Sequence, residues 1–146
     1  MSNNTNNSAN NHSALALRLA LGSVLLSHGL LKVLVFGLAG TVGFFASIGL
    51  PAVAAYLTIF GELAGGLALL LGVYTRLAAV LSIPILLGAT WAHIGNGWVF
   101  NNQGGGWEYP ALLVVLAAIV AVQGAGAYAL GGIRIVDAFV PRALRA

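Results

Sequence analysis

Residues 51–73 read PAVAAYLTIFGELAGGLALLLGV, an apolar stretch in which the only charged residue is Glu62. A helix rises about 1.5 Å per residue, so about 20 residues cross a hydrocarbon core roughly 30 Å thick. Three further segments, residues 14–35, 77–94 and 108–127, have a similar apolar character. The sequence therefore predicts an all-α, polytopic membrane protein, folded as a bundle of four membrane-spanning helices.

Composition supports a bilayer rather than water as the main surroundings of the chain. Only 6% of the 146 residues are charged, whereas about a quarter are charged in an average soluble domain. The formal net charge of +3 comes from Lys and Arg that are scattered along the chain, so no nucleic-acid partner is expected. The chain has no cysteine, which excludes disulfides and cysteine-bound iron–sulfur clusters.

The segments around the predicted spans divide the chain into three parts. Residues 1–13 are rich in asparagine and are expected to form a disordered tail. Residues 14–127 are expected to form the four-span domain. Within it, residues 36–50 are apolar but too short to cross, which predicts an interfacial or re-entrant segment between spans one and two. Residues 128–146 are expected to be a basic cytoplasmic tail.

Basic residues indicate the orientation in the membrane. Arg18 and Arg76 lie at one end of the predicted spans, and three arginines follow the fourth span, namely Arg134, Arg142 and Arg145. Lys and Arg favour the cytoplasmic side of a membrane. Both termini are therefore expected in the cytoplasm. Lys32 is the one basic residue near the outer ends of the spans, so its charge is expected to have a partner.

Five ionisable residues lie within the predicted spans or at their ends: His28, Lys32, Glu62, His93 and Glu108. Such groups are unfavourable in a membrane and usually mark a ligand site, a proton path or a paired contact. The helix rise places all five in the middle or outer half of the bilayer. We take them as candidate cofactor-binding residues, and the sequence assigns no catalytic residue.

The sequence also predicts how these groups pair, with alternatives. Glu62 lies in a pattern of small residues four apart, which favours close helix packing and an inward-facing carboxylate. The expected depths favour His28 over Lys32 as its partner, although a lysine stem can extend several ångströms. Glu62 is therefore expected near His28 or Lys32, and Lys32 can instead meet Glu108 or His93. An ion pair that only fixes helix packing remains an alternative to a proton-transfer or ligand-binding role.

Other cofactors have weaker support. His28 and His93 are of the right type to supply two axial ligands to a haem, but no other feature favours haem. Two histidines and two glutamates are also metal-ligand types, but they lack the local spacing of a metal motif. No metal site is predicted.

Six short motifs occur in order between residues 15 and 128: Arg18-Leu-Ala-Leu-Gly22, His28-Gly-Leu-Leu-Lys32, Gly43-Phe-Phe-Ala-Ser-Ile-Gly-Leu-Pro51, Gly61-Glu-Leu-Ala-Gly-Gly66, Tyr74-Thr-Arg-Leu-Ala78 and Gly105-Gly-Trp-Glu-Tyr-Pro110. Together they resemble the DoxX-like family of small bacterial membrane proteins. The resemblance implies a four-helix protein of the bacterial inner (plasma) membrane. The family is named after a similarity to the membrane subunit of a thiosulfate:quinone oxidoreductase, and some members are membrane anchors within redox-stress complexes.

The residues and the resemblance together predict an integral membrane subunit of a redox system, linked to quinone and dependent on a soluble or membrane-bound partner oxidoreductase. Quinone carbonyls need hydrogen-bond donors, and reduced quinone oxygens need groups that relay protons. His28, Lys32 and Glu62 are suitable types for both. Two alternatives to this redox role remain open. One is a non-catalytic membrane anchor or assembly protein. The other is a carrier of a small molecule or proton that works as a homo-oligomer.

Overall fold

The computed structural model describes residues 2–132, 137 and 139–145. Its elements in chain order are α1 (Ser2–Leu34), α2 (Gly37–Ser47), α3 (Ala52–Leu71), α4 (Thr75–His93), the 3-10 helix η1 (Ile94–Asn96), α5 (Glu108–Gln123) and the 3-10 helix η2 (Arg142–Leu144). No β-strand occurs in the described ranges. The all-α class predicted from the sequence is therefore confirmed.

Three helical segments are long and apolar enough to cross a membrane: Asn7–Leu34, Ala52–Leu71 and Thr75–Asn96. Helix α5 has 16 residues, about 24 Å of rise, and is shorter than the predicted fourth span. It ends before Gly124, whose φ of 85° is a conformation that favours glycine. Helix α2 is too short to cross, as predicted. The described chain thus has five α-helices rather than four, within the predicted multi-pass membrane class.

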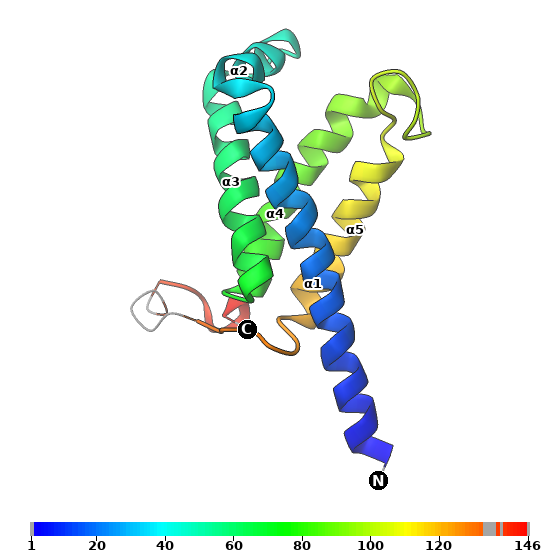
Figure 1. The fold of residues 1–146 in the computed structure, drawn as a ribbon, viewed down its shortest axis with the longest axis vertical. Coiled ribbons are helices and arrows are strands. Elements are labelled where there is room, and N and C mark those ends of the chain that lie inside the picture. The colour runs from blue at the N-terminus through cyan, green and yellow to red at the C-terminus, as the bar shows by residue number, and fades with distance from the viewer. Residues whose placement is uncertain (1, 133–136, 138, 146) are drawn as a thin grey trace.

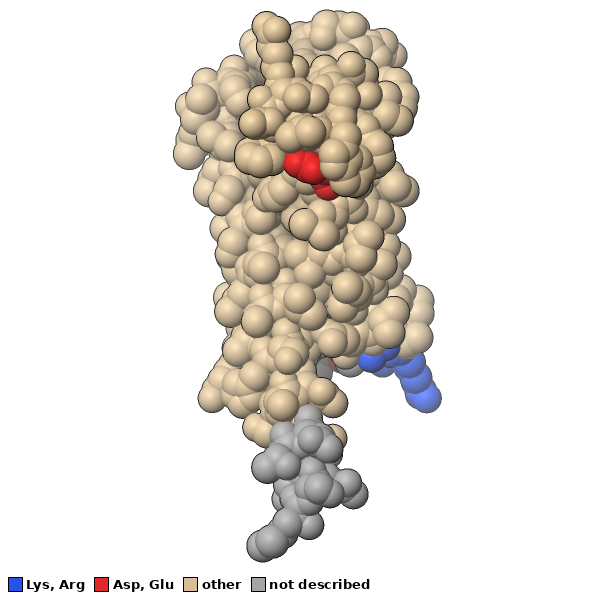
Figure 2. Space-filling view, turned by 90° about the vertical axis from the view of Figure 1, so that its right-hand side faces the viewer, with Lys and Arg blue, Asp and Glu red and all other residues tan. Residues whose placement is uncertain are grey.

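Large apolar side chains are exposed on the outer faces of the long helices and of α5: Leu57, Phe60, Leu67, Leu81, Leu87, Leu112, Val115 and Val122. Such a surface is unfavourable in water but is expected where a protein contacts lipid acyl chains. Figure 2 shows that most of one face carries no charged side chain, with acidic atoms toward its upper end and Lys and Arg at its lower end. This surface supports contact with the lipid bilayer.

The helices pack as two pairs. Helix α1 lies along α3, and α4 lies along α5. In Figure 1 the two pairs meet at the lower ends of α3 and α5, near the C-terminus, while the start of α1 projects below them, and the pairs diverge toward the end that carries α2 and the loop between η1 and α5. The residues of the central core are Leu21, Leu25, Leu69, Ala78, Ala79, Leu86, Leu113, Ala117 and Val120. The divergence leaves room between the pairs for the cavity described below.

Glycines allow α1 and α3 to approach closely. A Cβ atom on Gly66 would lie 2.6 Å from the backbone nitrogen of Leu26 and 2.9 Å from the carbonyl oxygen of Gly22. Both distances are shorter than real Cβ contacts, so a side chain at this position would push the helices apart. Close backbone contact at small residues is a common way for membrane helices to associate.

Arg18, near the middle of α1, joins this helix to two other segments. The side chain is almost fully buried, and its Nη1 donates to the carbonyl oxygens of Leu69 and Leu70 at 2.9 Å each. Nε and Nη2 donate to the carbonyl oxygens of Ala125 at 2.7 Å and Ala127 at 2.9 Å. The last carbonyls of a helix lack partners within the helix and attract a cation. Arg18 thereby ties α1 to the end of α3 and to the segment after α5.

The N-terminal segment differs from its prediction. A disordered tail is predicted over residues 1–13, whereas α1 continues through this segment to Ser2. Once a helix is established, each added residue gains a backbone hydrogen bond without a new nucleation cost. The carbonyl oxygen of Asn11 also accepts a hydrogen bond from the backbone N–H of Ala127 at 3.0 Å. The division of the chain at residues 13 and 127 stays a prediction.

Part of the predicted C-terminal tail lies against the bundle. The hydroxyl of Tyr74 donates to the carboxylate of Asp137 at 2.7 Å, and the side chain of Val140 is buried. Residues 133–136, 138 and 146 lie outside the described residues, and Arg134 is one of them. The assignment of this tail to the cytoplasm stays a prediction.

Candidate functional site

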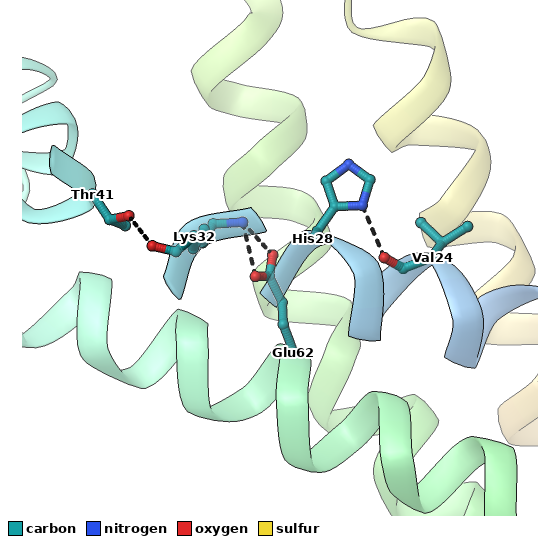
Figure 3. Close-up of polar contacts among 5 residues, drawn as sticks. All are labelled: Val24, His28, Lys32, Thr41 and Glu62. Atoms are coloured by element: carbon teal, nitrogen blue, oxygen red, sulfur yellow. Dashed lines mark hydrogen bonds and ion pairs between the residues drawn. The ribbon is translucent and has the colours of Figure 1, made fainter. Parts of the chain in front are cut away.

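Lys32 and Glu62 form an ion pair between α1 and α3. The Lys32 ammonium donates to both carboxylate oxygens of Glu62, at 2.7 and 2.8 Å (Figure 3). The side chains are only 19% and 8% exposed. The predicted inward position of Glu62 is therefore confirmed, and the expected charge partner of Lys32 is present.

Of the two predicted partners of Glu62, Lys32 is confirmed, and the depth-based preference for His28 is wrong. His28 instead makes a hydrogen bond to the carbonyl oxygen of Val24, one turn earlier on α1, at 2.8 Å. Depth along the helix axis does not account for the reach of a lysine side chain, whose apolar stem can extend several ångströms before the charge is placed. Lys32 therefore reaches a carboxylate that the rise per residue places at the level of His28.

Close packing and α2 hold the ion pair in place. A Cβ atom on Gly29 would lie 2.8 Å from the side chain of Leu63, so the two helices are in near contact between Lys32 and His28. The buried hydroxyl of Thr41 lies 3.1 Å from the carbonyl oxygen of Lys32 (Figure 3). It also lies 3.0 Å from the carbonyl oxygen of Gly37. This contact folds α2 back onto the end of α1, beside the ion pair.

A cavity of about 340 Å³ lies between the helix pairs and is lined by residues of all five α-helices. Its volume is within the usual range for small-molecule sites. The walls are mostly apolar and include Val24, Leu25, Phe44, Phe45, Ile48, Ile85, Leu86 and Leu113. The polar side chains that line it are His28, Lys32, Thr58, Glu62, His93 and Tyr109. An apolar cavity with a few polar groups is the usual form of a ligand site.

The structure thus brings together four of the five predicted site residues and separates the fifth. The backbone N–H of Phe100 donates to Glu108 Oε1 at 2.8 Å, and the N–H of Glu108 donates to the carbonyl oxygen of Trp98 at 3.1 Å. Glu108 therefore stabilises the loop before α5 and is not among the residues that line the cavity. The predicted alternatives that pair Lys32 with Glu108 or His93 are wrong.

His93 belongs to both the cavity and this loop. Its Nδ1 atom lies 3.0 Å from the carbonyl oxygens of Gly104 and Gly105. The side-chain amide of Asn96 donates to the same two oxygens, at 2.9 Å each. The loop is therefore fixed to the end of α4, and the imidazole of His93 is held at the cavity wall.

Sequence reasoning missed the aromatic part of the wall. Phe44 and Phe45 come from α2, and Tyr109 comes from the first turn of α5. Two consecutive phenylalanines in a helix of otherwise small residues indicate that α2 packs against another part of the protein. The sequence alone does not identify that part. Among the described residues, no three His, Cys, Asp or Glu side chains gather closely enough to bind a metal ion.

The chain is similar in sequence to known proteins. The DoxX family model matches residues 13–95, a range that contains His28, Lys32, Glu62 and His93. The chain is 43% identical over 75 residues to "Putative oxidoreductase CatD" of Bacillus subtilis (strain 168). That match covers 51% of this chain and 54% of the relative, so it spans only about half of that protein. No solved structure matches the chain. Because the family model covers more than half of its length, the chain belongs to the DoxX family.

Proposed function

We propose that this protein is the quinone-binding membrane subunit of a redox system and that it depends on a partner oxidoreductase. The observation that carries the proposal is the cavity between the helix pairs, which combines apolar and aromatic walls with the Lys32–Glu62 pair and two imidazoles. The name of the Bacillus relative, an oxidoreductase, supports a redox role. Its name identifies neither a quinone nor a partner.

The chemistry of a quinone suits these walls. A quinone is a flat apolar ring that dissolves in the bilayer, and Phe44, Phe45 and Tyr109 offer aromatic surfaces to it. The Lys32 ammonium has three N–H donors. Two of them bind Glu62, which leaves one for a quinone carbonyl.

Reduction of a quinone to its dihydroxy form takes up two electrons and two protons. Carboxylate and imidazole side chains can hold and release protons, and Glu62 and His28 line the cavity. The chain has no cysteine to carry electrons through a dithiol or an iron–sulfur cluster. In the proposal the partner oxidoreductase supplies the electrons, at the surface of a bacterial inner membrane.

Copurification tests this function. The protein is purified from its native membrane in a mild detergent, the lipids are extracted, and quinone is measured by mass spectrometry per mole of protein. Thermal stability is then followed as a short-chain quinone is added. We expect bound quinone in the extract and a stabilising shift. An extract without quinone, together with no shift, would overturn the proposal.

A matched pair of glycine variants locates the binding. Gly88 lines the cavity, Gly65 is not among its lining residues, and a Cβ atom on either meets nothing within 4 Å. Both glycines lie inside helices. The side chain introduced by Gly88→Leu would occupy space at the cavity wall. The side chain introduced by Gly65→Leu would occupy space away from the residues that line the cavity. We expect Gly88→Leu to lose the bound quinone and Gly65→Leu to keep it. Equal quinone in both variants would place the binding elsewhere.

A further inference from the structure

We infer that the cavity takes its aromatic ligand in the reduced, dihydroxy form, with hydroxyl groups that donate to Nε2 of His28 and His93. This inference rests on the proposed quinone site and specifies which redox form the site recognises. It concerns binding only. The argument uses the hydrogen bonds that the two imidazoles already make.

The tautomer of His28 follows from its partner. Nδ1 of His28 lies 2.8 Å from the carbonyl oxygen of Val24. A carbonyl oxygen can only accept a hydrogen bond, so Nδ1 must carry the proton. In the neutral imidazole, Nε2 is then unprotonated and can only accept. Figure 3 shows this second ring nitrogen pointing away from α1, without a drawn partner, and His28 lines the cavity.

Similar reasoning applies to His93. Its Nδ1 lies 3.0 Å from two carbonyl oxygens, those of Gly104 and Gly105, and 3.4 Å from the side-chain nitrogen of Asn96. Because the carbonyl oxygens are closer and can only accept, we assign the proton to Nδ1. The neutral ring again has Nε2 as an acceptor, on a residue that lines the cavity. Two histidines from different helices are thus held in the same tautomer by backbone carbonyls.

Counting donors and acceptors decides between the two forms of the ligand. Two of the three Lys32 N–H groups are occupied by Glu62, so this pair offers a single N–H donor. Against it stand two imidazole acceptors and the remaining lone pairs of the Glu62 carboxylate. The hydroxyls of Thr58 and Tyr109 can donate or accept, so they do not discriminate. Quinone oxygens only accept, whereas hydroquinone hydroxyls can donate. The acceptor-rich wall therefore favours the hydroquinone.

The test uses three probes with the same two ring methyl groups. They are a dimethyl-1,4-hydroquinone, the ether in which both of its hydroxyls are methylated, and the corresponding dimethyl-1,4-benzoquinone. Binding to the purified full chain is measured by calorimetry without oxygen, so that the hydroquinone stays reduced. One neutral hydrogen bond corresponds to about a tenfold change in affinity. We expect the hydroquinone to bind at least about tenfold more tightly than the dimethyl ether and also more tightly than the benzoquinone.

A histidine variant assigns the preference to a residue. His28→Phe keeps an aromatic ring and removes the acceptor, so hydroquinone affinity should fall about tenfold while benzoquinone affinity stays within about twofold. The control is His12→Phe. His12 lies on the same helix, makes the same type of bond to the carbonyl oxygen of Ser8 at 2.7 Å and is not among the cavity residues. It should change neither affinity.

The outcomes separate this inference from the proposed function. If the hydroquinone and the benzoquinone bind equally and His28→Phe changes both alike, the inference is wrong and the quinone site stands. If none of the probes binds, both are wrong. The comparison of hydroquinone with its dimethyl ether needs only the wild-type protein. It therefore decides the question even if His28→Phe fails to fold, and equal affinities for these two probes would overturn the inference.

Discussion

Removal of one member of the Lys32–Glu62 pair should cost far more stability than removal of both. The two side chains are 19% and 8% exposed, and both carboxylate oxygens bind the ammonium. A buried pair that loses one partner leaves an uncompensated charge, at a cost of about 3–5 kcal/mol. Because Lys32 is partly exposed, we expect about 3 kcal/mol for Lys32→Met. The Lys32→Met/Glu62→Gln double variant should lie within about 1 kcal/mol of the wild type.

A double-mutant cycle measures this coupling. Unfolding is followed by tryptophan fluorescence in mixed micelles of mild detergent and dodecyl sulfate, for the wild type, Lys32→Met, Glu62→Gln and the double variant. The single changes should not add: with at least about 3 kcal/mol for each of them and about 1 kcal/mol for the double variant, the coupling free energy should be at least about 5 kcal/mol. Changes that add to within about 0.5 kcal/mol, or single variants as stable as the wild type, would refute the reasoning that the pair is a buried, hydrogen-bonded contact.

The same variants separate a structural from a proton-transfer role. Glu62→Gln keeps the shape and hydrogen-bonding ability of the side chain but cannot cycle a proton. We expect it to assemble and to lose the quinone-linked activity of the native complex. An active Glu62→Gln protein would favour the reading in which the ion pair only fixes helix packing and the chain is a membrane anchor.

Three further predictions concern the fold. Arg18→Met removes four hydrogen bonds to carbonyl oxygens and should destabilise the protein by about 3 kcal/mol, measured in the same micelle assay; a change below about 0.5 kcal/mol would contradict the proposed tie between α1 and α3. Gly66→Ala places a Cβ atom 2.6 Å from the backbone of Leu26 and should be strongly destabilising, whereas Gly65→Ala enters open space and should be neutral or stabilising by up to about 1 kcal/mol. Reporter fusions after Val73 and at the C-terminus should both report the cytoplasm, and a periplasmic signal at either would contradict the orientation.

The features that depend on local sequence could be predicted. The all-α class, the long apolar helices and the short α2 follow from segment length and hydropathy. The inward position of Glu62 follows from its small-residue surroundings and from the cost of placing a carboxylate in lipid. Each of these needs only the composition of one helix.

Features that depend on where helices meet could not be predicted. The partner of Glu62 is decided by the reach of Lys32 and by the near contact at Gly29, neither of which is visible in one segment. Glu108 looks like an outer member of the site but is used to hold the loop at Phe100. The cavity itself arises because the α4–α5 pair diverges from α1 and α3 (Figure 1). Such a crossing geometry is set by packing of both pairs together.

Photoaffinity labelling in native membranes tests the central claim, quinone binding in the cavity, most directly. An azido-quinone is activated by light, the protein is digested, and the labelled residues are mapped by mass spectrometry with and without excess unlabelled quinone. The account predicts label that the competitor removes, on residues lining the cavity from α1, α2 and α4, such as His28, Phe44 and Ala89. Label confined to outward-facing residues such as Leu112 and Val122, or label that unlabelled quinone does not displace, would contradict it.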